Sequence, residues 1–233
     1  MKKIKNRRLV FYLCICIIFC CNNFVAVVKA ENNQLILQPV AFTSQAPTGY
    51  WSDQRQQDGC EEASALMAVV WARGHKMPTT AATKEKKLVA ISDWEQKNFG
   101  SYRDTSASST AERILKGYFD FTGYTVKQNI SLDNLRSAVN AGNVVVAPMN
   151  GMKLKNPYFT LPGPDRHMLL IIGYDAKTKE FITNDPGTKR GQGFRYSEKR
   201  LYEAIRDYPT GNHLPIVGTQ KNVIIISANK KPS

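Results

Sequence analysis

The chain has 233 residues, of which 42% are hydrophobic and 10% aromatic, and its formal net charge is +13. It contains no internal repeat and no long low-complexity linker, which excludes repeat architectures and strings of separate domains. The basic residues are spread along the chain without an RNA- or DNA-binding motif, so we expect no nucleic-acid partner.

Residues 1–30 have the pattern of a secretory signal peptide. A basic opening precedes the apolar run "LVFYLCICIIFCC", and "VKA" ends the segment with a small residue. The run is shorter than the about 20 apolar residues that a membrane-spanning helix needs. An uncleaved anchor is the alternative, because the apolar stretch "FVAVV" follows two asparagines. We therefore expect a secreted or cell-envelope protein that touches a membrane only through this segment.

Loss of residues 1–30 changes the charge and the cysteine content of the chain. Six basic and no acidic residues leave, so the net charge becomes +7, which permits only weak attraction to anionic surfaces. Four of the five cysteines leave as well, and Cys60 remains alone. An exported chain with one unpaired thiol has either buried it or uses it. We expect residues 31–233 to form a single domain and a monomer.

Helical patterns dominate the first half of this domain. A strand over 34–42 and a long loop over 43–59 precede a helix over 60–72, which has one buried stripe and ends at Gly74. Further helices are predicted over 83–98, 108–120 and 131–142.

Short β-branched segments dominate the second half. They are bounded by Gly, Pro, Asn or Asp, and they cover residues 143–149, 167–174, 180–185 and 222–227. Helices first and strands afterwards predict an α+β fold with two packed lobes.

Cys60 lies in the first turn of its predicted helix, directly after Gly59. The positive end of the helix dipole favours a thiolate there, whereas the charges of Glu61 and Glu62 oppose it. A cysteine nucleophile at this position therefore needs a partner base. The alternative is a buried free cysteine that acts as a small hydrophobic residue.

Three histidines are candidates for that base. His75 follows the helix end and lies about 20 Å from the thiol at 1.5 Å rise per residue. His213 lies in a turn near the C-terminus. His167 begins an apolar strand after the loop "FTLPGPDR", which suits a position facing a cleft, although an exposed strand-edge histidine would fit the same pattern.

Asp185 ends the segment that follows His167 in a predicted hairpin. A carboxylate there can fix the imidazole tautomer and stabilise the imidazolium. A regular hairpin closed by Asp175 and Glu180 places Asp185 opposite Leu170, so the pairing with His167 needs a bulge, a wider turn or a diagonal reach. The alternative role for Asp185 is that of a turn residue before a proline.

Together the segments "AFTSQAP", "GCEEASALM", "RHMLLIIGYD" and "ITNDPG" resemble the C39-like family of cysteine peptidases, which is related to bacteriocin-leader peptidases. The resemblance covers nearly all of the chain after residue 38. It implies a papain-like fold with an N-terminal helical lobe and a C-terminal antiparallel sheet lobe. It also implies Cys60 as nucleophile, His167 as base, Asp185 as orienting acid and Gln45 as oxyanion-hole donor, with Gln57 as the rival donor.

These observations predict an exported cysteine peptidase or amidase that hydrolyses a peptide or amide bond through an acyl-enzyme. Its substrate would be a peptide or protein, with a cell-wall peptide as one class, and acyl transfer is open to the same machinery. The alternative is a non-catalytic peptide- or wall-binding protein of the cell surface on the same scaffold. One cysteine and three scattered histidines give no metal-ligand spacing, so we expect no metal and no other cofactor.

Overall fold

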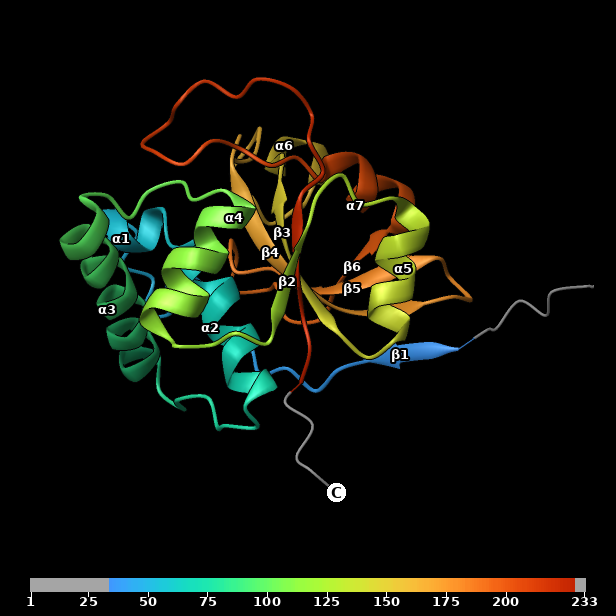
Figure 1. Cartoon of the computed structure of the whole chain (residues 1–233), viewed down its shortest axis with the longest axis horizontal. Coiled ribbons are helices and arrows are strands. Elements are labelled where there is room, and N and C mark those ends of the chain that lie inside the picture. The colour runs from blue at the N-terminus through green and yellow to red at the C-terminus, as the bar shows by residue number, and fades with distance from the viewer. Residues whose placement is uncertain (1–33, 229–233) are drawn as a thin grey trace, which may run out of the picture. The chain divides into compact units, whose positions relative to one another are not determined.

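A computed structural model describes residues 34–228, so the predicted signal segment lies outside the described part. A seven-stranded antiparallel sheet runs through the centre of this part (Figure 1). Its main path has the order β2-β7-β3-β4-β5-β6, and β1 pairs with β4 off this path. The strands are β1 (Leu35–Leu37), β2 (Tyr124–Lys127), β3 (Val144–Met149), β4 (His167–Asp175), β5 (Glu180–Asn184), β6 (Phe194–Ser197) and β7 (Val223–Ile226).

Most of the helices of the N-terminal half lie together on one side of the sheet, and the later ones lie on its other side or at its edge (Figure 1). The first group is α1 (Gln54–Gln57), α2 (Cys60–Ala72), α3 (Ala81–Phe99), α4 (Ala107–Thr110) and its π-helical continuation η1 (Ala111–Tyr118). The later helices are α5 (Leu132–Asn140), α6 (Gly151–Leu154) and α7 (Glu198–Ala204). This arrangement confirms the predicted α+β fold of papain-like type, with a helical lobe and an antiparallel sheet lobe.

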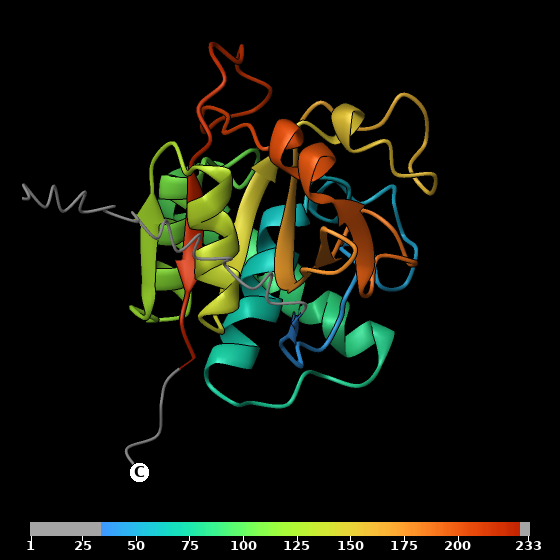
Figure 2. The ribbon, with the colours of Figure 1, turned by 90° about the vertical axis from the view of Figure 1, so that its right-hand side faces the viewer.

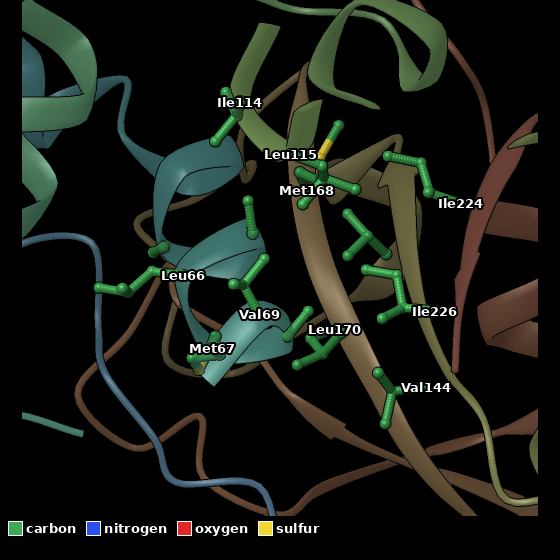
Figure 3. Packing of buried hydrophobic residues seen from close by; sticks show 14 of the residues in the cluster. Leu66, Met67, Val69, Ile114, Leu115, Val144, Met168, Leu170, Ile224 and Ile226 are labelled. Atoms are coloured by element: carbon green, nitrogen blue, oxygen red, sulfur yellow. The ribbon is translucent and has the colours of Figure 1, made fainter. Parts of the chain in front are cut away.

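Strand β4 shows why its sequence is a continuous apolar run. Successive side chains of a strand point to opposite faces, and both faces of β4 are covered. Met168 and Leu170 belong to one core on the face toward α2, and Figure 3 shows Val69 of α2 on the side of the helix that faces them. Leu169 and Ile171 belong to a second core on the other face, together with residues of α5 and α7. The strand that begins at His167 is therefore fixed from two sides.

Several boundaries differ from the sequence-based prediction. The strand expected over 34–42 is limited to Leu35–Leu37, and the helix expected over 108–120 is divided between α4 and η1. The segment expected over 180–185 ends as a strand at Asn184, which leaves Asp185 just beyond it. Within residues 34–228, no helix combines the length and apolar character needed to cross a bilayer.

Candidate active site

The N-terminus of α2 fixes the position of the thiol. Gly59 precedes the helix without a side-chain cap, and a Cβ atom at this position would lie 2.6 Å from the carbonyl oxygen of Arg55. Glycine is therefore required here because the backbone of α1 passes so close. Cys60 is the first residue of α2 and is 7% exposed, with a free thiol.

Hydrogen bonds join this end of α2 to the start of β4, one directly and two through Tyr208. One helical turn after Cys60, the Ser64 hydroxyl donates to the carbonyl oxygen of Met168 at 3.2 Å. The hydroxyl of Tyr208 donates to Glu61 Oε1 at 2.8 Å and lies 3.5 Å from the carbonyl oxygen of His167. Residues of α2 close to Cys60 are thus hydrogen-bonded, directly or through Tyr208, to Met168 and His167 of β4.

A β-bulge brings Asp185 onto the same face of the hairpin as His167. Asp175 pairs with Glu180 as expected, but the register shifts between Ile171 and Gly173, so that Asn184 lies opposite Leu170. The next residue, Asp185, therefore continues opposite position 169, which shares its face with His167 because side chains alternate. The acid then reaches the imidazole diagonally, and its Oδ1 lies 2.8 Å from His167 Nε2. The difficulty of the regular hairpin is resolved by the bulge.

Asp185 has a complete set of partners although it is fully buried. Besides His167, the N–H of Gly187 donates to Oδ1 at 3.1 Å, and the Tyr196 hydroxyl donates to Oδ2 at 2.7 Å. The side-chain amide of Asn156 reaches the same oxygen at 3.3 Å. Burial alone would raise the pKa of Asp185, but the charge of His167 and these hydrogen bonds lower it below its ordinary value. The carboxylate therefore stays ionised beside the imidazole.

This contact also sets the tautomer of His167. Because Nε2 faces a carboxylate, we assign the proton to Nε2, which leaves Nδ1 as the nitrogen with no hydrogen bond in the described part of the chain. The ring is 2% exposed and meets Phe159 edge-to-face, with centroids 5.3 Å apart. An imidazole held in this way presents a lone pair at Nδ1.

The thiol is bonded to a neighbour other than the histidine. Cys60 Sγ donates to Glu61 Oε2 at 3.0 Å, and among residues 34–228 no hydrogen bond joins Cys60 to His167. Burial, followed by the charge of Glu61, raises the pKa of the Cys60 thiol well above its ordinary value. Burial also raises the pKa of Glu61 to about 7, against the hydrogen bonds from Cys60 and Tyr208. In this arrangement the thiol is neutral.

More buried carboxyl groups lie behind Glu61. Glu62 accepts a hydrogen bond from the Ser92 hydroxyl at 2.6 Å. Among the described residues, neither carboxyl oxygen of Glu95 in α3 has a hydrogen-bond partner. Burial, together with the charge of Glu61, raises the pKa of Glu95 to about 8. The pKa of Glu62 is raised as well, by burial and then by the charge of Glu95. Because their pKa values are raised, the carboxyl groups of Glu62 and Glu95 favour the protonated form inside the helical lobe.

Both candidate glutamines line the same cavity as Cys60 and His167, which has a volume of about 1000 Å³. Gln45 is buried, and its amide nitrogen donates to the carbonyl oxygens of Gln56 at 3.0 Å and Gln57 at 2.7 Å. Its own Oε1 has no hydrogen-bond partner in residues 34–228. Gln57 is exposed, and its side chain makes no hydrogen bond within the described residues. The side-chain amide of Gln45 must therefore rotate away from these two carbonyl oxygens before it can donate to an oxyanion. The side-chain amide of Gln57 has no such hydrogen bond to break among the described residues.

The remaining histidines lie in different places. His213 is on the rim of the cavity, where its Nδ1 lies 3.2 Å from Asp104 Oδ2 and 61% of its side chain is exposed. His75 is exposed beyond the end of α2 and does not line the cavity. The aromatic side chains Trp51, Tyr158 and Phe159 line it, and Tyr50 does not.

The comparisons with known proteins concern the family and the fold of the chain. The sequence profile of the Peptidase_C39 like family matches residues 38–210. The chain belongs to this family. The crystal structure of a Bacillus anthracis protein provisionally assigned as a C39-like peptidase is 15% identical, with a TM-score of 0.53. The alignment covers 85% of this chain and 100% of that one, and at this identity it supports the fold alone. The search of curated proteins found no significant match.

The C39-like family membership supports a peptidase-type domain. Within residues 34–228, no group of three or more His, Cys, Asp or Glu side chains is arranged to hold a metal ion.

Sequence reasoning missed three residues that support the site of this C39-like domain: Asn156, Tyr196 and Tyr208. Their hydroxyl and amide groups contact Asp185 or Glu61 from distant parts of the chain. Tyr196 lies in the short strand β6, whose sequence FRYS alternates aromatic and polar residues, and this alternation is a local signal that Tyr196 points inward.

Proposed function

We propose that this C39-like protein is an exported cysteine peptidase or amidase that uses Cys60, His167 and Asp185. The observation that carries the proposal is the buried His167–Asp185 pair, which presents Nδ1 in the cavity that Cys60 also lines. A thiol, an imidazole with a free nitrogen and an orienting acid are the groups that acyl transfer through a thioester requires.

The reaction would begin with a rotation of the Cys60 side chain away from Glu61 and toward His167. His167 Nδ1 takes the thiol proton, and Sγ attacks the acyl carbon of the substrate. The oxyanion that forms accepts hydrogen bonds from the backbone N–H of Cys60 and from the side-chain amide of Gln45 or Gln57. The imidazolium returns its proton to the leaving amine, which departs as the thioester forms.

Water then completes the cycle. His167 removes a proton from a water molecule that attacks the thioester, and the thiolate leaves and is reprotonated. An amine in place of water would give acyl transfer with the same groups. Asp185 keeps Nε2 protonated and stabilises the imidazolium in both halves of the reaction.

One observation favours a second function, a non-catalytic binding protein. The thiol is bonded to Glu61 and its pKa is raised, which is the state of an inert cysteine. The aromatic side chains of the cavity would serve peptide binding equally well.

Alkylation of Cys60 separates the two functions. The rate of its reaction with iodoacetamide is measured from pH 5 to pH 10 in the wild-type protein and in His167→Asn. A cysteine peptidase gives a faster rate below pH 7 in the wild type than in the variant. If both profiles rise together near the free-thiol pKa of about 8.5 or above it, the binding function is the correct one.

A further inference from the structure

A second cavity, of about 700 Å³, lies outside the candidate active site. It is formed by α6, by α7 and by residues that precede β7, and α6 and α7 pack against each other (Figure 2). Its basic lining residues are Lys153, Lys155, Lys199, Arg200, Arg206 and Lys221. Its acidic lining consists of Glu203. We propose that this basic cavity binds a soluble ligand that carries two or more phosphate groups.

Most of the positive charge in the cavity has no counter-ion. Within residues 34–228, Arg206 is the one lining cation in an ion pair, and its Nη2 lies 2.7 Å from Asp165 Oδ1. Elsewhere in this protein basic side chains on the same lobe do find carboxylates, as Arg195 does with Asp175 and Glu180. The cavity therefore differs from an ordinary surface of mixed charge.

The cations also lie close enough to repel one another. Lys221 Nζ is held in place by hydrogen bonds to the carbonyl oxygens of Tyr202 at 2.6 Å and Ile205 at 2.9 Å. Burial, followed by the charge of Lys153, lowers the pKa of this ammonium group. A bound anion would relieve both effects, because it supplies the missing counter-charge and replaces lost solvation.

The number of cations selects the class of ligand. Six basic side chains line the cavity with Glu203, and Arg206 is already paired with Asp165, so an excess of four positive charges remains. One phosphate group carries about −1.5 to −2 charges at neutral pH, so one group cannot balance this excess. Arginine and lysine side chains together match phosphate oxygens, with the guanidinium able to bind two at once.

The surroundings argue against a membrane or a nucleic acid as the occupant. The large apolar side chains exposed on the described surface, such as Leu161 and Val217, do not line this cavity, so no residue there would insert into lipid. The aromatic lining residue Tyr202 has Lys221 Nζ over its ring at 4.7 Å, so its face is not open for base stacking. A soluble ligand with two or more phosphate groups, such as an oligophosphate, remains.

The test measures the affinity of the full-length protein for a probe, sodium tripolyphosphate, by isothermal titration calorimetry. The cavity variant carries Lys153→Gln, Lys199→Gln and Arg200→Gln. The control variant removes the same charge from exposed lysines of α3, through Lys86→Gln, Lys87→Gln and Lys97→Gln. The cavity variant should lose about tenfold or more in affinity, and its salt dependence should fall by about one unit per removed cation, while the control changes less than about twofold.

Three results would overturn the proposal. One is no binding of millimolar tripolyphosphate by the wild type. Another is an equal loss in both triple variants, which would show that net charge alone drives binding. The third is binding to phosphatidylglycerol vesicles, or to a single-stranded oligonucleotide, without binding to tripolyphosphate. If the cavity variant does not fold, Arg200→Gln alone replaces it. Cys60 does not line this cavity, so Cys60→Ala should bind the probe as the wild type does.

Discussion

On the sheet side of the cleft, His167 and Asp185 are bonded at 2.8 Å and every oxygen of the acid has a donor. On the helix side, Cys60 is bonded to a carboxylate that opposes its ionisation. The proposed base is thus organised in the free protein, whereas the proposed nucleophile is held in its neutral form. In the proposed reaction, rotation of the Cys60 side chain away from Glu61 separates the two states. The comparison teaches that Glu61, on the helix side, is the group that opposes ionisation of the thiol.

The largest expected effect comes from the organised side. His167→Asn keeps the size of the side chain but cannot take a proton near neutral pH. Turnover should fall by about 10²–10⁴-fold, the usual contribution of a positioned base, and alkylation of Cys60 at pH 6 should slow. Because His167 is buried and bonded to the buried Asp185, the melting temperature should also fall, and circular dichroism should show that the variant is folded at the assay temperature. His75→Asn is the matched control, because His75 is exposed outside the cavity, whereas His213 lies on its rim.

The oxyanion donor lies between the two sides, on the loop before the thiol. Gln45→Ala should lower turnover by about 10²-fold and leave KM nearly unchanged, because a donor of this kind acts mainly in the transition state. Gln57→Ala is the comparison, measured by the same steady-state kinetics. A large effect of Gln57→Ala with none from Gln45→Ala would transfer the role to the exposed glutamine.

The helix side is tested by Glu61→Gln, which removes the charge beside the thiol and keeps the shape. The pKa of Glu61 is raised to about 7, so the wild-type carboxyl is neutral below this pH and ionised above it. We therefore expect equal alkylation rates for wild type and variant near pH 5, and an about tenfold faster rate for the variant at pH 8.

Glu61 lies close to several other titratable groups. Cys60 and Tyr208 are hydrogen-bonded to it, and Glu62, Glu95 and Asp104 interact with it through charge. Glu62→Gln serves as a control for charge within the same lobe and should change the profile less. Parallel profiles for wild type and Glu61→Gln would show that this carboxylate does not control the thiol.

The smallest effect concerns the stability of the helical lobe. Because the pKa of Glu95 is raised to about 8 in the folded protein, its proton stabilises the fold at low pH, and this stabilisation is lost as pH rises from about 4.5 to 8. Glu95→Gln should therefore raise the melting temperature at pH 8 by about 2–8 °C and change it little at pH 5. Thermal unfolding followed by circular dichroism measures this, with the exposed Glu112→Gln as control.

The sequence predicted the elements whose signals are local. The thiol at the start of α2 and the histidine at the start of β4 follow from a glycine, a periodic stripe and an apolar run. The sequence indicated only that the pairing of Asp185 with His167 needs a bulge, a wider turn or a diagonal reach. It could not predict the bulge itself, because a bulge depends on how two strands and β1 fit together. Gly173 shows this dependence, because a Cβ atom there would lie 2.4 Å from the carbonyl oxygen of Ile36 on β1.

Contacts between distant segments account for the rest. The hydrogen bond from Tyr208 to Glu61 joins residues 147 positions apart, and no pattern near either residue indicates it. The sequence did show that the charge of Glu61 opposes a thiolate. It could not show that the carboxylate would be buried and bonded to the thiol itself.

The bulge in β4 also determines where the length of this hairpin can change. The turn over 176–179 lies beyond the last strand pair, Asp175 with Glu180, so a residue inserted there leaves every pair between the bulge and Asp185 intact. Deletion of Ile172 removes the extra residue and moves Asp185 to the opposite face from His167. Insertions and deletions in related chains should therefore gather in the turn and be absent between the bulge and the acid.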